Sequence, residues 1–471
     1  MINNCETGIY TQFIPDLRLR KRVNLALNNM ILSGSSIINK TTAKHADKIG
    51  TYRMLSNDSV TLNYLLEGSF TKCIENIDSD HILCIQDTTE FNFDSIMGKI
   101  GKEDPDIGPT SHNTIGGFFC HPVIAINCTG SKIYGMPAAS FYNRKWDKTT
   151  KEIRNYKSLP IEEKESYRWI KVSEQTKRKV PQGISITIIG DRENDIYEDL
   201  ALVPDKRTQI LIRSRCDRVL YNNPKSLYQV LEEQVVAGKK EVELKGNKGR
   251  AARKTNLNIK FCKVCIGIVH PRKNYPKQVE LFAIEAKEDE TNTPLGEEPI
   301  HWRLLTTHSI EQVEQAIQCI EWYKMRWIIE ELFRVIKTKG FEIESSQLSN
   351  GAAIKKLLAL TLEAAMCIMQ MKLSLNEASD TLTKNSFSNK QIQLLKILNK
   401  KLEGNTTKQQ NPYPPENLAW ATWVLARLGN WNGYQKSGPP GYITIKNGFD
   451  KFNFQFEIYD LLYNEKDVYK D

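Results

Sequence analysis

The sequence lacks the features that identify secreted and membrane-spanning proteins. Its first residues, MINNCETGIYTQ, do not show the order of charged, apolar and small residues that is typical of a signal peptide. The longest apolar-rich stretch, 357–371, is interrupted by Glu363 and is short for a bilayer-spanning helix. Ten cysteines are present without dense, paired spacing, which favours reduced thiols. We therefore expect a soluble, cytoplasmic protein.

The sequence also lacks a zinc-binding or histidine-based catalytic pattern. Cys262 and Cys265 form a CxxC pair, but no second pair or histidine cluster accompanies them at zinc spacing. Both cysteines alternate with apolar residues in a predicted strand, so we interpret them as core residues. The seven histidines are scattered, with no recognisable nucleophile–base arrangement.

What the chain does contain is ordinary globular composition and an excess of positive charge. Its 471 residues are 40% hydrophobic and 26% charged, which is enough for a large core and for two to four domains. The net charge of +9 favours an anionic partner without identifying one.

The pattern of apolar residues predicts an α/β protein. Short basic helices joined by Gly/Ser turns in residues 1–60 are typical of a DNA-reading module, or equally of a charged helical cap. Strand-like runs at 82–85, 118–127, 132–142 and 183–190 alternate with helical segments. Short strands and a basic loop, KGNKGRAARK, indicate a mostly β insertion at about 207–305. From residue 350 onward the pattern is helical.

A long helix is predicted from Ser309 to Gly340, and it carries a polar stripe. At about 100° per residue, Tyr323, Arg326, Glu330 and Lys337 lie close together on one face, opposite an arc of apolar residues. Taken alone, such a stripe is most simply the solvated face of a surface helix.

Two aspartates favour a catalytic interpretation of the stripe. Asp87 and Asp191 each follow an apolar strand, and such strand ends meet at one edge of an α/β sheet. Together with Glu330 they would form a cluster of carboxylates that attracts Mg²⁺. Two such ions can activate water or a 3′-hydroxyl for attack on a phosphodiester. Either aspartate alone could instead cap a turn.

Neighbouring acids compete for these roles. Glu193 and Asp195 compete with Asp191, and Glu331 competes with Glu330. We prefer Asp191 because it lies at the strand end, and Glu330 because Glu331 lies about 100° further round the helix.

The spacing of Tyr323, Arg326, Glu330 and Lys337 resembles the Y-R-E-K signature of bacterial cut-and-paste DDE transposases. This is the insertion-sequence-four type of family that includes the transposase of transposon five. The segments QDTTEF around Asp87 and GDREND around Asp191 resemble the family's two Asp motifs. The segments EKES at 163–166, the basic loop and WATWVLARLGN at 420–430 resemble it in the same order.

The resemblance implies a ribonuclease-H-like catalytic domain over 61–372 with the β insertion inside it. A helical domain over 1–60 would bind the transposon end, and a helical domain over 373–471 would mediate dimerisation. The implied reaction is excision by metal-dependent phosphodiester cleavage through a hairpin intermediate, followed by joining of the 3′-OH ends to target DNA. The implied cofactor is a pair of Mg²⁺ ions, for which Mn²⁺ can substitute.

The resemblance also assigns roles to residues. Asp87, Asp191 and Glu330 would be the catalytic metal ligands, and Tyr323, Arg326 and Lys337 would hold DNA phosphates. Trp302 matches a tryptophan that stacks on a flipped base, although core packing in a strand explains it equally well. The remaining expected DNA contacts are Arg213, Arg53, Lys248, Arg250, Arg253 and Lys254. The partners would be double-stranded transposon ends and target DNA, bound by a homodimer in a paired-end complex associated with the nucleoid.

Two other functions remain open from the sequence. The chain could be a catalytically inactive or inhibitory DNA-binding protein derived from a transposase, or a ribonuclease-H-like nuclease without transposition. A nicking assay with Mg²⁺ separates the first from an enzyme, and joining of cut ends to a plasmid separates the second.

Overall fold

The computed structural model describes residues 12–146, 159–244, 252–268, 275–289, 293–337, 340–375, 381–434 and 438–468. The chain divides into two compact units that interleave along the sequence. The helix-rich unit comprises Met1–Asp78, Thr88–Lys148 and Glu330–Asp471, and the sheet unit comprises Ser79–Asp87 and Thr149–Ile329. The three consecutive domains expected from the sequence stay a prediction.

The sheet unit contains three parallel strands extended by four antiparallel ones. Strands β1 (His81–Gln86), β6 (Ser185–Gly190) and β7 (Thr208–Arg213) are parallel, and β1 and β6 are almost entirely buried because they are runs of apolar residues. The strand order β1-β6-β7-β11-β10-β9-β8 shows that the predicted β insertion continues the same sheet. Its strands are β8 (Gly238–Leu244), β9 (Arg253–Gly267), β10 (Gln278–Glu288) and β11 (His301–Thr306).

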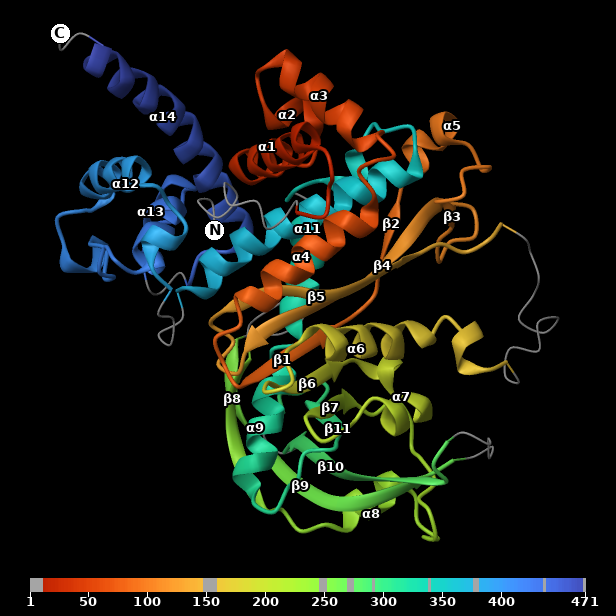
Figure 1. The fold of residues 1–471 in the computed structure, drawn as a ribbon. Helices are drawn as coiled ribbons and strands as arrows, with labels where there is room; N and C mark the ends of the chain where they lie inside the picture. Colours follow the sequence, from red (N-terminus) through yellow and green to blue (C-terminus); the bar gives the residue numbers. More distant parts are fainter. Residues whose placement is uncertain are drawn as a thin grey trace. The chain divides into compact units, whose positions relative to one another are not determined.

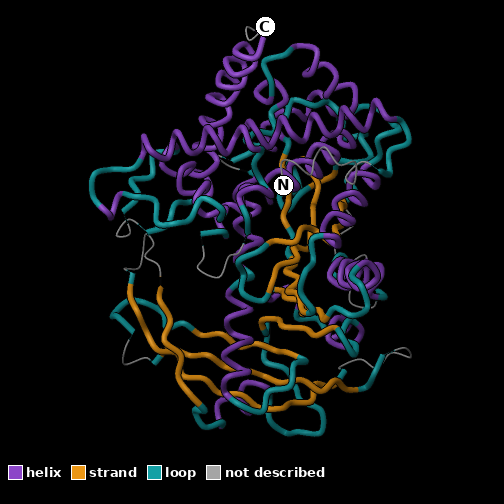
Figure 2. The backbone as a smooth tube through the Cα atoms, turned by 60° about the vertical axis from the view of Figure 1, so that its left-hand side comes forward, coloured by secondary structure: helices purple, strands orange, loops and turns teal. Residues whose placement is uncertain are grey.

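Strands β9 and β10 are long and curved (Figures 1 and 2). The helices of this unit are α6 (Tyr167–Lys179), α7 (Tyr197–Leu202), α8 (Leu227–Glu233) and α9 (Val313–Lys324). Cys262 and Cys265 lie in β9, three residues apart, so their side chains point to opposite faces. Both are only partly buried, so their interpretation as core residues was too strong.

The helix-rich unit combines antiparallel strands with long helices. Strands β2 (Thr89–Asn92), β3 (Gly108–Pro109) and β5 (Ile133–Tyr142) all pair with β4 (Gly116–Asn127). The helices before residue 78 are α1 (Leu17–Ser33), α2 (Ile38–Thr41), α3 (His45–Leu55) and α4 (Leu62–Glu75). The later ones are α5 (Met97–Ile100), α11 (Gly351–Leu373), α12 (Asn389–Leu402), α13 (Leu418–Leu428) and α14 (Tyr442–Val468).

Helix α11 is buried along nearly its whole length, as its apolar sequence predicts. Glu363, which interrupts that apolar run, is buried at 4% exposure and accepts a hydrogen bond of 2.7 Å from the Ser69 hydroxyl. Lys72 forms an ion pair with the same carboxylate. Because both partners lie on α4, this buried acid joins α4 to α11. None of the helices in the described ranges is long and apolar enough to cross a bilayer.

The predicted helix from Ser309 to Gly340 is two helices. Helix α9 begins at Val313 with a capping box between Gln312 and Gln315, and ends at Lys324. Helix α10 spans Trp327–Ile336, so its first three residues belong to the sheet unit and the rest to the helix-rich unit. Between the helices, backbone bonds such as Met325 N–H to Trp322 C=O connect residues three apart. These tighter turns interrupt the α-helical register.

The break corrects the position of Tyr323. This side chain is buried with Ala316, Cys319 and Ile320 on the inner face of α9, so it does not belong to a solvated stripe. The apolar arc of α10 is where the sequence predicts it, because Ile329, Leu332, Val335 and Ile336 are all buried.

A candidate active site at the carboxyl ends of β1 and β6

Asp87 and Asp191 lie at the same edge of the sheet. In the parallel pairing of β1 with β6, Ile85 is opposite Ile189, and each aspartate is two residues further along its strand. Neighbouring strands are about 4.8 Å apart, so the two carboxylates emerge from adjacent positions. Both aspartates are partly exposed.

The local structure after β6 fixes the position of Asp191. Asp191 begins a single 3₁₀ turn, Arg192–Asn194, and its Oδ1 accepts a hydrogen bond of 2.7 Å from the backbone N–H of Glu193. It therefore does cap a turn, as the simpler interpretation proposed. A cap uses one carboxylate oxygen, which is compatible with metal ligation through the other.

The competing acids are held by arginines. Glu193 is paired with Arg168 at 2.6 Å, and the carboxylate of Asp195 is fully buried against Arg218 at 2.5 Å. In the helix-rich unit, Glu331 forms an ion pair with Arg334. These contacts favour Asp191 over its neighbours.

Asp87 faces a cation in the sheet unit. An amino nitrogen of the Arg326 guanidinium (Nη1) lies 3.2 Å from Oδ2 of Asp87, and the two side chains are only 16% and 17% exposed. Arg326 lies in the short turn between α9 and α10. The break in the predicted helix therefore places Arg326 where it reaches a carboxylate at the strand end.

Beside this edge, the sheet unit contains a polar cleft of about 490 Å³. Trp302 and Arg213, which the sequence analysis predicted as DNA contacts, both line it. The other cationic and aromatic residues that line it were not predicted from the sequence; they are Arg192, Arg215, Tyr228, His301 and Arg303. A signal for two of them was available, because Arg192 follows Asp191 and Arg215 follows the strand that ends at Arg213.

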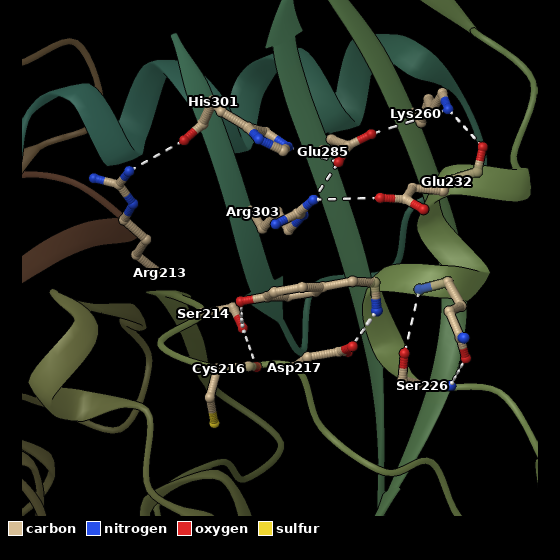
Figure 3. Close-up of polar contacts among 12 residues, drawn as sticks. Arg213, Ser214, Cys216, Asp217, Ser226, Glu232, Lys260, Glu285, His301 and Arg303 are labelled. Atoms are coloured by element: carbon tan, nitrogen blue, oxygen red, sulfur yellow. Dashed lines mark hydrogen bonds and ion pairs between the residues drawn. The ribbon is translucent and has the colours of Figure 1, made fainter. Parts of the chain in front are cut away.

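The cleft side chains are held in place by neighbours (Figure 3). Arg213 donates a hydrogen bond of 3.1 Å to the carbonyl oxygen of His301, and burial lowers the pKa of its guanidinium. Arg303 donates to Glu285 at 3.1 Å, and its guanidinium lies 3.8 Å from the centre of the Tyr228 ring. The cleft therefore presents fixed positive charge beside aromatic rings.

Trp302 and Tyr323 meet edge to face, with ring centres 6.1 Å apart. Trp302 is partly exposed, which leaves ring surface for stacking. Burial raises the pKa of the Tyr323 hydroxyl, so that group stays protonated and able to donate a hydrogen bond near neutral pH.

Glu330 and Lys337 belong to the helix-rich unit. Glu330 lies in the first turn of α10 and is partly exposed. The Lys337 ammonium lies 5.1 Å from the centre of the Phe91 ring, and burial lowers its pKa. Within the described ranges, no three His, Cys, Asp or Glu side chains are assembled as a metal site. The convergence of Glu330 with Asp87 and Asp191 stays a prediction.

The remaining predicted DNA contacts differ in their availability. Arg53, in the last turn of α3, is exposed, and Lys254 is exposed with its ammonium 3.3 Å from Glu241. Arg253 is largely buried and is engaged by Glu288 and Glu297, so it is the least available of the three. Lys248 and Arg250 lie outside the described residues.

Residues 169–368 match the model of the family described as Transposase DDE domain. The matched stretch includes Asp191, Glu330 and the residues predicted to hold phosphates, whereas Asp87 precedes it. The match implies a ribonuclease-H-like fold and a transposase or nuclease type of enzyme, and it implies DNA as a partner.

Proposed function

We propose that the chain is a DNA transposase that excises a transposon through a hairpin intermediate and joins its 3′-OH ends to target DNA. The observation that carries the proposal is the placement of Asp87 and Asp191 at adjacent strand ends of one sheet. The family match over residues 169–368 supports the same reaction class.

The donor set suits a divalent metal. Asp87 and Asp191 supply carboxylate oxygens, which Mg²⁺ and Mn²⁺ prefer as ligands, and we assign the third carboxylate to Glu330. Asp87 already forms an ion pair with a cationic group, Arg326. The metal ions, when bound, would activate the attacking hydroxyl and stabilise the departing oxygen.

The protein's own side chains would position the DNA. The guanidinium groups of Arg213 and Arg326 offer paired donors for phosphate oxygens, and Lys337 offers a point charge. Trp302 would stack on a base that has left the duplex, because stacking tolerates any base identity. Its location in the arginine-lined cleft supports a site for an unpaired nucleotide next to its phosphates.

We assign recognition of the transposon end to the first 60 residues, where Arg53 is exposed on α3. We assign dimerisation to the C-terminal helices. Helix α14 exposes Phe454, Ile458, Leu461 and Leu462, whose spacing of four, three and one residues forms a single apolar stripe. A second copy of the helix would cover that stripe.

The test first searches the DNA beside the gene for inverted repeats and then incubates DNA that carries these candidate ends with the protein, Mg²⁺ and a target plasmid. The proposal predicts nicked ends, hairpin ends and joined products in that order. Binding without cleavage would identify an inactive DNA-binding protein, and cleavage without joining would identify a nuclease.

A further inference from the structure

Asp195 has an environment unlike that of a metal ligand. Its side chain is fully buried, and its Oδ2 accepts a hydrogen bond of 2.7 Å from the backbone N–H of Arg215. Its Oδ1 accepts two bonds from Arg218, from Nε at 3.0 Å and from Nη2 at 2.5 Å. Both carboxylate oxygens are thus committed to protein donors.

The same arginine also binds the backbone of that segment. Arg218 Nη2 donates to the carbonyl oxygen of Asp195 at 2.7 Å. The guanidinium therefore fixes both the side chain and the main chain of Asp195, four residues beyond Asp191. The short turn between them leaves little freedom, because Asn194 is fully buried and Asp191 caps the turn.

On its other side, Arg218 ends the segment 214–218, whose first two residues, Ser214 and Arg215, line the arginine-lined cleft. The Ser214 N–H donates to the carbonyl oxygen of Arg303 at 2.8 Å. Asp217 accepts a bond of 2.8 Å from the N–H of Tyr228, whose ring lies against Arg303. Displacing this segment would move both Tyr228 and Arg303.

A buried ion pair seldom stabilises a protein more than apolar residues of the same size would, but breaking it leaves an unpaired charge. In some proteins such a pair instead specifies one conformation. We infer that Asp195 and Arg218 are a positioning pair that couples occupation of the arginine-lined cleft to the metal-binding competence of Asp191. The inference rests on the proposed function, because that function gives Asp191 its role as a ligand.

The coupling is measurable with two simple probes, Mn²⁺ and a labelled single-stranded oligonucleotide. If the cleft and Asp191 share one fixed geometry, bound oligonucleotide changes the Mn²⁺ affinity, and Mn²⁺ changes the oligonucleotide affinity by the same factor. We expect a factor of about five or more in the wild type.

The variants are Asp195→Asn, which keeps the shape and removes the charge, and Arg218→Lys, which keeps the charge and removes the planar fork. The double variant completes a mutant cycle. The matched control is Glu280→Gln, which breaks the exposed ion pair with Lys263 in the same unit. Circular dichroism at the assay temperature shows whether each variant is folded. If Asp195→Asn does not fold, Arg218→Lys alone tests the inference.

We expect each single variant to reduce the coupling factor to below about two, and the double variant to reduce it no further. The coupling factor of the control Glu280→Gln should equal that of the wild type. Wild-type coupling in Arg218→Lys, or no coupling in the wild type, would overturn the inference. If the wild-type protein shows coupled binding of Mn²⁺ and oligonucleotide but does not cleave DNA, only the proposed function is refuted. If the wild-type protein cleaves DNA and the coupling persists in both Asp195→Asn and Arg218→Lys, only the role of the positioning pair is refuted.

Discussion

The two ends of the parallel strands β1 and β6 carry different chemistry. At the carboxyl end, Asp87 and Asp191 are partly exposed, and Arg326 lies beside Asp87. At the amino end, His81 and His308 each lie 2.8 Å, through Nε2, from the hydroxyl of Thr187. Both histidines also contact the Trp322 ring, and together they line a cavity of about 670 Å³.

The two ends differ in whether their titratable side chains carry charge near neutral pH. At the amino end, burial lowers the pKa of His308 to about 4, helped by the neighbouring His81, whose own pKa burial also lowers. Both rings are therefore neutral near pH 7, and the buried Thr187 hydroxyl lies within hydrogen-bond distance of one nitrogen of each. At the carboxyl end, by contrast, the carboxylate of Asp87 forms an ion pair with Arg326. We therefore expect the amino end to contribute to stability and the carboxyl end to carry the proposed reaction.

The largest expected effect is at the carboxyl end. Asp87→Asn or Asp191→Asn keeps the shape of the side chain and removes a metal-binding charge. We expect DNA cleavage to fall by at least about a hundredfold, since even partners of metal ligands cost 10–100-fold when changed. The denaturation midpoint should stay near that of the wild type. Cleavage within about tenfold of the wild type in either variant would contradict the assignment.

The second effect is the pH dependence of stability at the amino end. As pH falls below about 6.5, the unfolded chain protonates His308 first, while the folded chain resists until about pH 4. The contribution of His308 to the free energy of unfolding is therefore fully present above pH 6.5. It decreases by about 3 kcal/mol as the pH falls to 4. Urea unfolding of wild type and His308→Gln across this range measures it. Identical pH profiles would contradict the buried neutral ring.

A smaller effect is expected from Thr187→Val, which removes the hydroxyl shared by the two histidines. Leaving a buried ring nitrogen without a partner costs about 1–3 kcal/mol. The denaturation midpoint should fall, while Mn²⁺ binding stays at the wild-type level. A loss of Mn²⁺ binding would show that the two ends are not independent.

The smallest effect concerns Arg326. Arg326→Gln removes a cation from Asp87. Because the pair is mostly buried, we take the upper end of the range for exposed pairs, about 1 kcal/mol, or about fivefold in affinity. We expect Mn²⁺ to bind about fivefold more tightly without DNA, and DNA to bind less tightly. Calorimetry measures both. Weaker Mn²⁺ binding would mean that Arg326 supports the metal site instead of competing with it.

The strands and aspartates of this site could be predicted because their signals are local. The runs before Asp87 and Asp191 are apolar and end abruptly at an acid, so strand ends were evident. The helix break after Lys324 could not be predicted in the same way, because residues 322–329 contain neither Gly nor Pro. The burial of Tyr323 was recoverable, since it continues the 316, 319, 320 spacing of the apolar face.

The cleft and the histidine cluster depend on pairing between distant segments. Arg213 and Trp302 reach the same cleft because β7 pairs with β11 in an antiparallel register, which no short sequence pattern specifies. His81 and His308 looked scattered for the same reason, as Thr187 on β6 brings them together. Long-range strand order, and not residue type, decided these sites.

The most direct test of the account is Mn²⁺ binding in the presence of end DNA, measured by calorimetry for the wild type, Asp87→Asn, Asp191→Asn and Glu330→Gln. Glu331→Gln, one residue further along α10 and paired with Arg334, is the matched control. The account predicts that the first three variants lose Mn²⁺ binding and that Glu331→Gln retains it. Wild-type binding by Glu330→Gln would contradict the claim that three carboxylates hold the metal.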